Sequence, residues 1–466
     1  MPHKASQDID SNKLFLVNFS ELEGRLDPAF YNPTYYKLLD SKKVNWVRLN
    51  AVTENLKHPP EYKRNFVVEG YQLIRSQNVR PTGIDLSENP VFLAKDVVLS
   101  TSAIFPQIND ILIVRSGVNA GDVAVVEDEL KDVTIGADTL LLNVNQEVLP
   151  KFVQVYFFTE IGRNQLNRYV TGATNKHLNS YSLKHVYFPK IDILVQKKCV
   201  AIIEDAFWQK HQRKEQAESL LGSIDTYLLN ELWVTLPEVH NDLKDRMFFL
   251  NRSDLEGRFD PTIYKDGIRL VSSKWDNVKL SNVAHINPEG SYRGTPTSTP
   301  ISFIPMEVID ESFSEIVEMG GTTIEQSSGF TKFKEGDLLW AKITPCMQNG
   351  KSAVAKNLIN GLGCGSTEFF VLRPKDERLA IEYLHVIFHM KCVRETAKLY
   401  FGGSAGQQRV SSSFLEKFKL PLPPKDKQIE IALRVYEMRQ QAKVLQEEGS
   451  TILENAKKEV EEIIMG

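Results

Sequence analysis

The sequence predicts an α+β protein: two β-rich domains in a pseudo-twofold tandem repeat, separated by two long antiparallel helices that form a coiled coil. The segment LEGRLDPAFY at residues 22–31 returns as LEGRFDPTIY at residues 255–264, with seven of ten positions identical. Short β-type runs broken by turn residues fill the centre of each half, and a long helical pattern follows each of them. A single repeat spaced by 233 residues indicates two related domains, because solenoid units are only about 20–50 residues long.

The likeness of the two halves continues beyond this segment. DILIVR at residues 110–115 corresponds to DLLWAK at 337–342, and YVTG at 169–172 corresponds to YFGG at 400–403. Gln196 and Gln428 then open two helical stretches in the same register. The sequence therefore predicts four parts: a first domain at 1–194, a first spacer helix at 195–235, a second domain at 236–424 and a second spacer helix at 425–466.

Both spacer helices carry a narrow apolar stripe on alternating three- and four-residue steps. Such a stripe is too narrow to stabilise a helix alone in water, so each helix needs a partner, and the other helix is the obvious one. A helix of roughly 38 residues would rise about 57 Å at 1.5 Å per residue. The expected seam residues are Val200, Ile203, Phe207, Ala217, Leu221, Ile224 and Leu228 in the first helix, and Val435, Ala442, Leu453, Ala456, Val460 and Ile463 in the second.

The amino-acid composition limits which classes of function are plausible. The chain has 466 residues, 42% of them hydrophobic, which is enough for more than one buried core. Its 56 Lys and Arg against 60 Asp and Glu give a net charge of -4, which argues against a broad affinity for a phosphate backbone but not against local basic patches. No long apolar run or secretory signal is present, so we expect a cytoplasmic protein without a membrane segment, in which the four cysteines are free thiols.

Catalytic and metal motifs are weak throughout. The glycine-rich pieces at residues 361–365 and 401–406 lack the strand-loop-helix setting of a phosphate loop and are interpreted as turns. His385, His389 and Cys392 share one helix face but lack a fourth ligand, which favours packing over a metal site. No nucleophile elbow, P-loop, zincin helix, methyltransferase loop or nuclease pattern is found, so we predict a chain without catalytic activity and without its own cofactor.

Two loops at equivalent places of the repeat, residues 171–177 and 402–409, combine small residues with amide and basic side chains. Asn and Gln can bind adenine in the major groove, Arg and Lys can bind guanine, and glycine lets the backbone approach a phosphate. These loops are candidate contacts to double-stranded DNA, with a plain turn-rich loop as the alternative. The candidate residues are Thr174, Asn175, Lys176, His177, Gln407, Gln408 and Arg409.

Three further turns follow expected strands and present similar donors. For each of them an ordinary solvated loop remains the alternative to a base or phosphate contact. The candidate residues are Arg115 and Asn119 in the first domain, and Arg293, Gln348, Asn349 and Lys351 in the second.

The LEGR segments need a separate interpretation, because they stay alike where the two domains differ. Their sameness suggests that both halves face the same kind of protein partner, while the alternative is that they tie each domain to the helix pair. The candidate partner-binding residues are Arg25, Asp27, Tyr31, Arg258, Asp260 and Tyr264.

Taken together, these features resemble the specificity subunit of a Type I restriction-modification system, over essentially the whole chain. The resemblance rests on the LEGR pair, on GDLLWAKITPCMQNGKSAVA with the following GCGSTEFFVLRP, and on GATNKHLNSYSLKHVYFP matched with GGSAGQQRVSSSFLEKFKLPLPPKDKQ. The first half departs from the family pattern at FPKIDILVQ, where a proline-rich turn is expected, so the start of the first spacer helix is uncertain by a few residues.

The resemblance implies two target-recognition domains that each read one half of a split DNA sequence. It also implies a non-catalytic subunit that assembles with two methyltransferase subunits and two ATP-dependent restriction subunits, with S-adenosylmethionine and ATP bound by those partners. Three alternatives stay open: the recognition subunit of a Type IIB-like system, a two-domain scaffold that does not contact DNA, and a fused enzyme with a degenerate methyltransferase or nuclease site.

Overall fold

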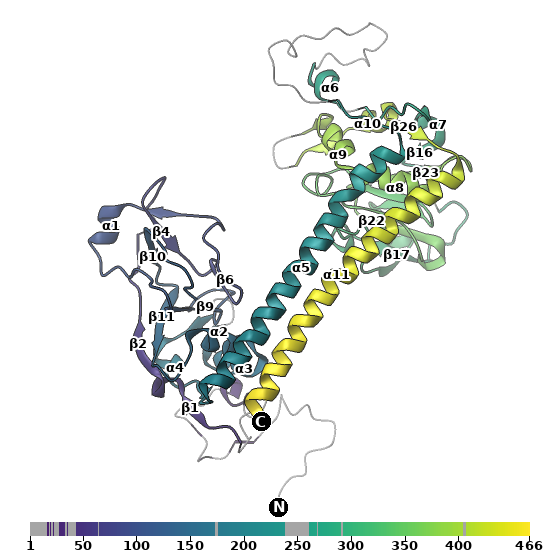
Figure 1. Cartoon of the computed structure of the whole chain (residues 1–466). Coiled ribbons are helices and arrows are strands. Elements are labelled where there is room, and N and C mark those ends of the chain that lie inside the picture. The colour runs from purple at the N-terminus through teal and green to yellow at the C-terminus, as the bar shows by residue number, and fades with distance from the viewer. Residues whose placement is uncertain are drawn as a thin grey trace, which may run out of the picture. The chain divides into compact units, whose positions relative to one another are not determined.

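The computed structural model describes residues 16–17, 19, 22, 28–32, 35, 43–63, 65–172, 176–237, 261–267, 269–289, 292–403 and 407–466. The chain divides into two compact units (Figure 1). Unit 1 comprises residues 1–213 and 447–466, and unit 2 comprises residues 214–446. Each unit therefore contains a part of both long helices.

The central sheet of unit 1 has the strand order β2-β11-β8-β9, with every pair antiparallel. Strand β8 reads ILIV and is buried along its whole length, as expected for a β-branched run inside a sheet that is covered on both faces. The strands are β2 (Thr53–Lys57), β8 (Ile111–Val114), β9 (Val123–Val125) and β11 (Thr139–Val144).

A second four-stranded sheet and three short strand pairs complete the β-structure of unit 1. The second sheet has the order β10-β4-β7-β3, and its β10–β4 pair is parallel. Its strands are β3 (Phe66–Val67), β4 (Tyr71–Ile74), β7 (Phe92–Leu93) and β10 (Val133–Ile135). The pairs are β1 (Trp46–Arg48) with β14 (Tyr187–Pro189), β5 (Val79–Arg80) with β6 (Gly83–Ile84), and β12 (Val170–Thr171) with β13 (His177–Leu178).

Helices α2 (Pro150–Phe158) and α3 (Glu160–Tyr169) meet at a sharp corner. Thr159 ends α2, and its hydroxyl accepts a hydrogen bond from the backbone N–H of Gly162 at 3.2 Å, which caps α3. A Cβ on Gly162 would lie 1.9 Å from the carbonyl oxygen of Tyr156, so only glycine permits this close turn. The remaining helical segments before the first long helix are η2 (Pro28–Tyr31), η4 (Leu49–Ala51), α1 (Lys95–Leu99) and α4 (Ser180–Leu183).

Unit 2 repeats much of this plan. Its central sheet has the order β16-β23-β20-β21 and its second sheet the order β18-β17-β22-β19, in which β17 and β22 are parallel. The strands are β15 (Asp276–Lys279), β16 (Ala284–Ile286), β17 (Pro300–Ile304), β18 (Gly320–Thr323), β19 (Thr331–Lys334), β20 (Leu338–Ala341), β21 (Ser352–Val354), β22 (Leu362–Gly365), β23 (Phe369–Pro374), β24 (Phe401–Gly402), β25 (Arg409–Val410) and β26 (Lys419–Leu422). The helical segments are α6 (Pro261–Asp266), α7 (Leu280–Val283), η7 (Met306–Val308), η8 (Glu325–Ser327), η9 (Ile359–Gly361), α8 (Ile381–His389), α9 (Lys391–Lys398) and α10 (Ser412–Lys417).

The long helices α5 (Ile193–Glu231) and α11 (Lys425–Met465) pack together in both units (Figure 1). In unit 1 the first part of α5 joins one core with the last part of α11, whereas in unit 2 the last part of α5 joins the first part of α11. The two helices are therefore antiparallel, as the amphipathic stripes predicted. Four expected seam positions differ: Val200, Phe207, Leu221 and Ile463 are only partly buried, whereas Cys199, Ala206 and Ile464 are buried in the core. None of the helices in the described ranges is long and apolar enough to cross a membrane.

Two buried glutamines fix the long helices to the domains in the same way. The side-chain oxygen of Gln196 accepts a hydrogen bond from the backbone N–H of Leu149 at 2.9 Å, directly before α2. The side-chain oxygen of Gln428 accepts one from Ala380 at 2.8 Å, directly before α8. The sequence placed these two glutamines at equivalent positions of the repeat. Both have the same structural role, which is to anchor a domain helix to the following long helix.

The other long helix supplies a carboxylate to each unit. In unit 1, Glu461 of α11 accepts a hydrogen bond from the backbone N–H of Ile161 in the first turn of α3, at 3.0 Å. In unit 2, Asp225 of α5 accepts one from the backbone N–H of Lys391, which begins α9, at 2.9 Å. A carboxylate at a helix N-terminus satisfies a free N–H group and the positive end of the helix dipole. Each unit therefore needs a residue from the long helix that follows the other domain.

Candidate nucleic-acid interface

In unit 1 the structure brings two predicted loops together at the end of β8. The backbone N–H of Leu178 donates to the carbonyl of Arg115 at 2.8 Å. Ser116 and His177 face each other in an antiparallel bridge, with the hydroxyl of Ser116 3.1 Å from Nδ1 of His177. We call residues 115–121 together with 176–178 the unit 1 corner. It contains four candidate residues, namely Arg115, Asn119, Lys176 and His177.

The side chains of this corner differ in how free they are. Nη1 of Arg115 donates to the carbonyl of Ala137 at 3.1 Å, which holds the half-buried guanidinium close to the sheet. Lys176 is exposed. Burial, supplemented by the charge of Arg115, lowers the pKa of His177 below its ordinary value. His177 is therefore neutral at pH 7, with one ring nitrogen that donates and one that accepts.

Unit 2 forms the same frame at the end of β20. The backbone N–H of Thr344 donates to the carbonyl of Gln408 at 2.9 Å, and that of Val410 donates to the carbonyl of Lys342, also at 2.9 Å. Residues 343 and 409 face each other in an antiparallel bridge, as residues 116 and 177 do in unit 1. We call residues 342–344 together with 407–410 the unit 2 corner. It contains the candidate residues Gln407, Gln408 and Arg409.

Arg409 is held by Glu368, a residue that the sequence analysis did not single out. Nε and Nη2 of Arg409 both donate to the Glu368 carboxylate, at 3.0 and 2.7 Å, and this hydrogen bonding raises the pKa of Arg409. The Arg409 side chain is exposed and Glu368 is half-buried, so solvent screens the pair and its contribution to stability is small. A guanine edge would offer Arg409 the same two-acceptor geometry that Glu368 offers now.

The candidates at residues 348–351 are bound within their own domain. Nζ of Lys351 donates to the carbonyl of Met306 at 3.1 Å and lies 3.9 Å from the Glu311 carboxylate, and only 14% of its side chain is exposed. Nδ2 of Asn349 donates to the same carboxylate at 3.2 Å. Gln348 accepts a hydrogen bond at its carbonyl from Arg394. These contacts give the segment a structural role inside unit 2.

Arg293 is exposed in a turn that belongs to the other sheet of unit 2. The backbone N–H of Thr295 donates to the carbonyl of Tyr292 at 3.0 Å and closes this turn. The hydroxyl of Tyr292 donates to the carbonyl of Gly363 in β22 at 2.5 Å. The turn is therefore fixed to β22, and the unit 2 corner is fixed to β20.

The LEGR candidates are only partly covered by the structure. Tyr31 is buried in the core of unit 1, where its ring packs edge-on against Phe30 at 5.0 Å between centroids. Tyr264 is half-buried in α6. The burial of Tyr31 favours a structural role for this position over a direct partner contact. Six further candidates lie outside the described residues: Thr174, Asn175, Arg25, Asp27, Arg258 and Asp260.

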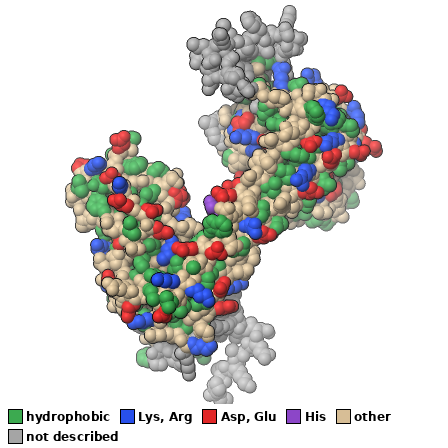
Figure 2. All heavy atoms as spheres, viewed as in Figure 1, with side chains coloured by type: hydrophobic (Ala, Val, Ile, Leu, Met, Phe, Trp, Pro, Cys, Tyr) green, Lys and Arg blue, Asp and Glu red, His purple; other side chains and the backbone are tan. Residues whose placement is uncertain are grey.

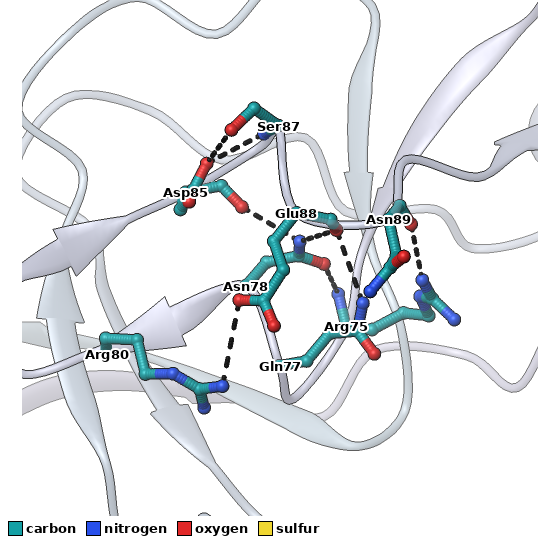
Figure 3. Close-up of polar contacts among 8 residues, drawn as sticks. All are labelled: Arg75, Gln77, Asn78, Arg80, Asp85, Ser87, Glu88 and Asn89. Atoms are coloured by element: carbon teal, nitrogen blue, oxygen red, sulfur yellow. Dashed lines mark hydrogen bonds and ion pairs between the residues drawn. The ribbon is translucent and has the colours of Figure 1, made fainter. Parts of the chain in front are cut away.

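A polar loop beside the unit 1 corner was missed by the sequence analysis (Figure 3). Asn78 is buried at its base, where its Oδ1 accepts from the backbone N–H of Arg75 at 3.0 Å and its Nδ2 donates to the carbonyl of Asp85 at 2.8 Å. A Cβ on Gly117 would lie 3.9 Å from the hydroxyl of Ser76, so this loop and the corner are neighbours. The available signal was RSQN directly after a strand, a pattern that resembles many ordinary turns.

The histidine-rich face of α8 is a packed surface, as the sequence analysis favoured. Nε2 of His385 lies 3.2 Å from the hydroxyl of Ser352. Burial, with the added charge of Arg439, lowers the pKa of His385 to about 3, and the pKa of His389 is well below its usual range for the same reasons. Within the described part of the chain, no group of three or more His, Cys, Asp or Glu side chains could hold a metal ion.

The surface charge is mixed. On the face drawn in Figure 2, basic and acidic side chains are interspersed over both units, and no broad basic field stands out. This pattern agrees with the net charge of -4. Contact with nucleic acid through this chain would depend on a few placed donors more than on general attraction to phosphate.

Comparison with known proteins shows similarity to one family. The family described as "Type I restriction modification DNA specificity domain" matches residues 272–443. The chain is 36% identical over 162 residues to the specificity subunit of the Type I restriction enzyme EcoEI from Escherichia coli. The chain thus carries a match to this family at residues 272–443 and is similar to Type I specificity subunits.

The similar proteins differ in how much of this chain they match. The EcoEI match covers 34% of this chain and 26% of that protein, and a match to the EcoAI specificity subunit of Escherichia coli, 32% identical, covers 41% of this chain and 32% of that protein. The chain thus matches about a quarter to a third of the length of these relatives. A solved structure of a type I R-M system aligns with 90% of this chain and 96% of its own, at 16% identity and a TM-score of 0.55, which shows a shared fold.

Proposed function

We propose that this specificity subunit reads a bipartite DNA target, with unit 1 contacting one half-site and unit 2 the other. The observation that carries the proposal is the equivalence of the two corners. The bridge between Ser116 and His177 in unit 1 is matched by the bridge between Ile343 and Arg409 in unit 2. Because the two corners share their backbone hydrogen bonds but carry different side chains, both units could approach the major groove of DNA in the same way and read different bases.

The chain would act within an assembly. Two methyltransferase subunits that bind S-adenosylmethionine would methylate the target, and two ATP-dependent restriction subunits would act on unmodified DNA. This chain would bind neither cofactor. The partners would also supply phosphate contacts, which a chain with a net charge of -4 provides only sparsely.

Sequencing of methylated bases in a host that expresses this chain with its methyltransferase subunit tests the proposal. We expect a single split motif with methylated adenines, and no methylation at that motif when this chain is omitted. Methylation that does not depend on this chain, or a motif without a gap, would contradict the proposal.

The long helices are proposed to set the gap between the half-sites. Inserting one heptad into both α5 and α11 near residues 213 and 446 lengthens each helix by about 10 Å, or roughly three base pairs at 3.4 Å each. We expect the methylated motif to gain about three unspecified base pairs and to keep both half-sites. The control carries the heptad in α5 alone, which shifts the seam and should abolish methylation. An unchanged gap in the doubly extended variant would rule out this role.

Arg409 is the residue of the unit 2 corner with the clearest expected effect. We expect Arg409→Ala to weaken binding to the specific site by about 1–3 kcal/mol, as for loss of a two-hydrogen-bond contact to guanine. The folding stability of this variant should change little, because the Arg409 side chain is exposed and solvent screens its ion pair with Glu368. A mobility-shift titration of the assembled methyltransferase on the cognate site measures this, with Arg434→Ala as the matched control for an exposed arginine. Equal affinity of the two variants would remove Arg409 from the interface.

A further inference from the structure

Glu368 holds the side chain of Arg409 in one orientation. Both carboxylate oxygens of Glu368 accept from Nε of Arg409 at 3.0 Å, and one of them also accepts from Nη2 at 2.7 Å. Nη1 donates to the carbonyl of Gln407 at 3.1 Å. Arginine is among the side chains with the most rotamer freedom, and these contacts remove much of that freedom from Arg409 before any ligand arrives.

The same contacts leave part of the guanidinium available. A guanidinium carries five N–H groups, and the contacts of Arg409 with described residues use one on each of its three nitrogens. One N–H on Nη1 and one on Nη2 thus remain without an acceptor in the described ranges. The Arg409 side chain is 43% exposed, so a ligand can reach it. Two neighbouring N–H groups match the O6 and N7 acceptors of a guanine edge.

Glu368 is itself fixed by its backbone. Its N–H donates to the hydroxyl of Ser366 at 3.2 Å, and its carbonyl accepts from the backbone N–H of Lys342, which directly follows β20, at 2.9 Å. The next residue, Phe369, is buried and begins β23. The carboxylate therefore projects from a turn that is bound to the end of one central strand and continuous with another.

Unit 1 has an acidic residue at the equivalent place. The backbone N–H of Arg115 donates to the carbonyl of Asp138 at 2.7 Å, which is the contact that the Glu368 carbonyl makes in unit 2. Burial and the charge of Arg115 lower the pKa of His177, and the charge of Asp138 acts in the opposite direction. Asp138 thus lies near His177, which occupies the position of Arg409 in the repeat. An acidic group beside this position belongs to the frame that both corners share.

The charge of Glu368 also offsets that of Arg409. A phosphate backbone attracts an unpaired arginine whatever the base sequence. An arginine paired with a carboxylate attracts phosphate less, but its remaining N–H groups can still bind acceptors on a base edge. Glu368 should therefore weaken nonspecific contacts with DNA and favour one base.

We propose that Glu368 is a positioning residue for DNA recognition by unit 2, which orients Arg409 so that Nη1 and Nη2 face a guanine of the half-site. Glu368 does not contact the base and acts through Arg409. This inference rests on the proposed function, because it requires unit 2 to bind DNA. It adds that the choice of base depends on a carboxylate 41 residues away in the sequence.

Glu368→Gln keeps the size of the side chain, removes its charge and replaces one acceptor oxygen with an amide nitrogen that cannot accept from Arg409. We expect the assembled methyltransferase with this variant to bind the site found by methylation sequencing about three- to tenfold more weakly, the cost of ordering one flexible side chain on binding. Affinity for a duplex without the site should rise, and its salt dependence should steepen by up to about one counter-ion, because the charge of Arg409 is released.

Mobility-shift titrations of the two duplexes at several salt concentrations measure these opposite changes, which a purely structural role of Glu368 would not produce. Asp376→Asn is the matched control, because it breaks another exposed arginine–carboxylate pair of unit 2, with Arg378 at 2.8 Å. This variant should bind both duplexes as the wild type does.

A double variant tests whether Glu368 acts through Arg409. In the Arg409→Ala background, Glu368→Gln should have no further effect on binding to the site. Selection from duplexes randomised in the half-site of unit 2 should show that Glu368→Gln relaxes the preference for one guanine. An equal loss in both backgrounds, an unchanged affinity or an unchanged base preference would overturn the positioning role and leave the bipartite-recognition proposal standing. If the wild-type assembly bound both duplexes equally, the proposed function itself would fail.

Discussion

Replacing Trp340 with alanine is expected to destabilise unit 2 by about 3–5 kcal/mol, the usual cost of deleting a buried aromatic side chain. Trp340 lies in β20 with 0% of its surface exposed. Its ring stacks against Phe370 at 6.1 Å and Phe414 at 5.9 Å, and meets Phe388 edge-on at 5.0 Å. Removal of the indole leaves a cavity among three rings that cannot all move to fill it.

The effect should reach the unit 2 corner, because β20 leads directly into residues 342–344 and Phe414 lies in α10 just after β25. Hydrogen exchange should accelerate in β20 and β23 while β8 and β11 of unit 1 stay protected. Under the proposed function, recognition of the half-site assigned to unit 2 should weaken more than that of the half-site assigned to unit 1. Trp340→Phe is the control: it keeps an aromatic ring and removes an indole N–H that has no partner in the described part of the chain, so its cost should stay below about 1.5 kcal/mol. Equal exchange in both units of Trp340→Ala would contradict this assignment.

Asp337→Asn should cost about 3 kcal/mol, at the lower end of the range for breaking a buried ion pair. Asp337 is 1% exposed, and its carboxylate accepts hydrogen bonds from Nε and Nη2 of Arg373 at 2.6 and 2.7 Å. It also accepts one from the backbone N–H of Lys334 at 2.7 Å. The amide leaves the charge of Arg373 without its counter-ion, and the partial exposure of Arg373 reduces the penalty.

Unit 1 supplies the matched control for this substitution. Asp110 occupies the equivalent position and binds the backbone N–H of Gln107 at 2.8 Å, but its side-chain partner is the neutral Asn143, at 2.5 Å. Asp110→Asn leaves no unpaired charge, so its cost should be about 1 kcal/mol, that of one weakened hydrogen bond. Urea unfolding of the two variants measures the difference. A cost for Asp110→Asn equal to that for Asp337→Asn would show that the ion pair with Arg373 does not account for the effect.

The helices and the repeat could be predicted because their signals lie in consecutive residues. The alternating apolar steps of residues 200–228 and 435–463 report one face of a helix directly, and α5 and α11 lie where these patterns are. The register of Gln196 and Gln428 was also readable, since both open a helix at the same place of the repeat. Their hydrogen bonds to Leu149 and Ala380 were not readable, because these partners lie 47 and 48 residues away in the sequence.

The candidate site was also predictable only in part. Residue type and loop position selected Arg115 and Arg409, and the structure places each at the end of a central strand of its unit. The same reasoning selected Lys351, which is half-buried against Met306 and Glu311, because a lysine in a polar turn looks alike whether or not a distant segment covers it. Glu368 escaped notice because nothing near it in the sequence indicates that it holds an arginine 41 residues away.

By itself the sequence determined that this chain is a doubled protein with two long amphipathic helices and without a recognisable catalytic motif, since repeats, helical periodicity and motifs are local or directly comparable patterns. Only the tertiary structure decided which side chains are free. The fold of each unit brings residues 116 and 177, or 343 and 409, face to face, and the packing of α5 against α11 places Asp225 and Glu461 at helix ends of each unit. It also buries Arg439 with two side-chain nitrogens that have no hydrogen-bond partner among the described residues, because burial and pairing depend on distant segments that meet only when the chain folds.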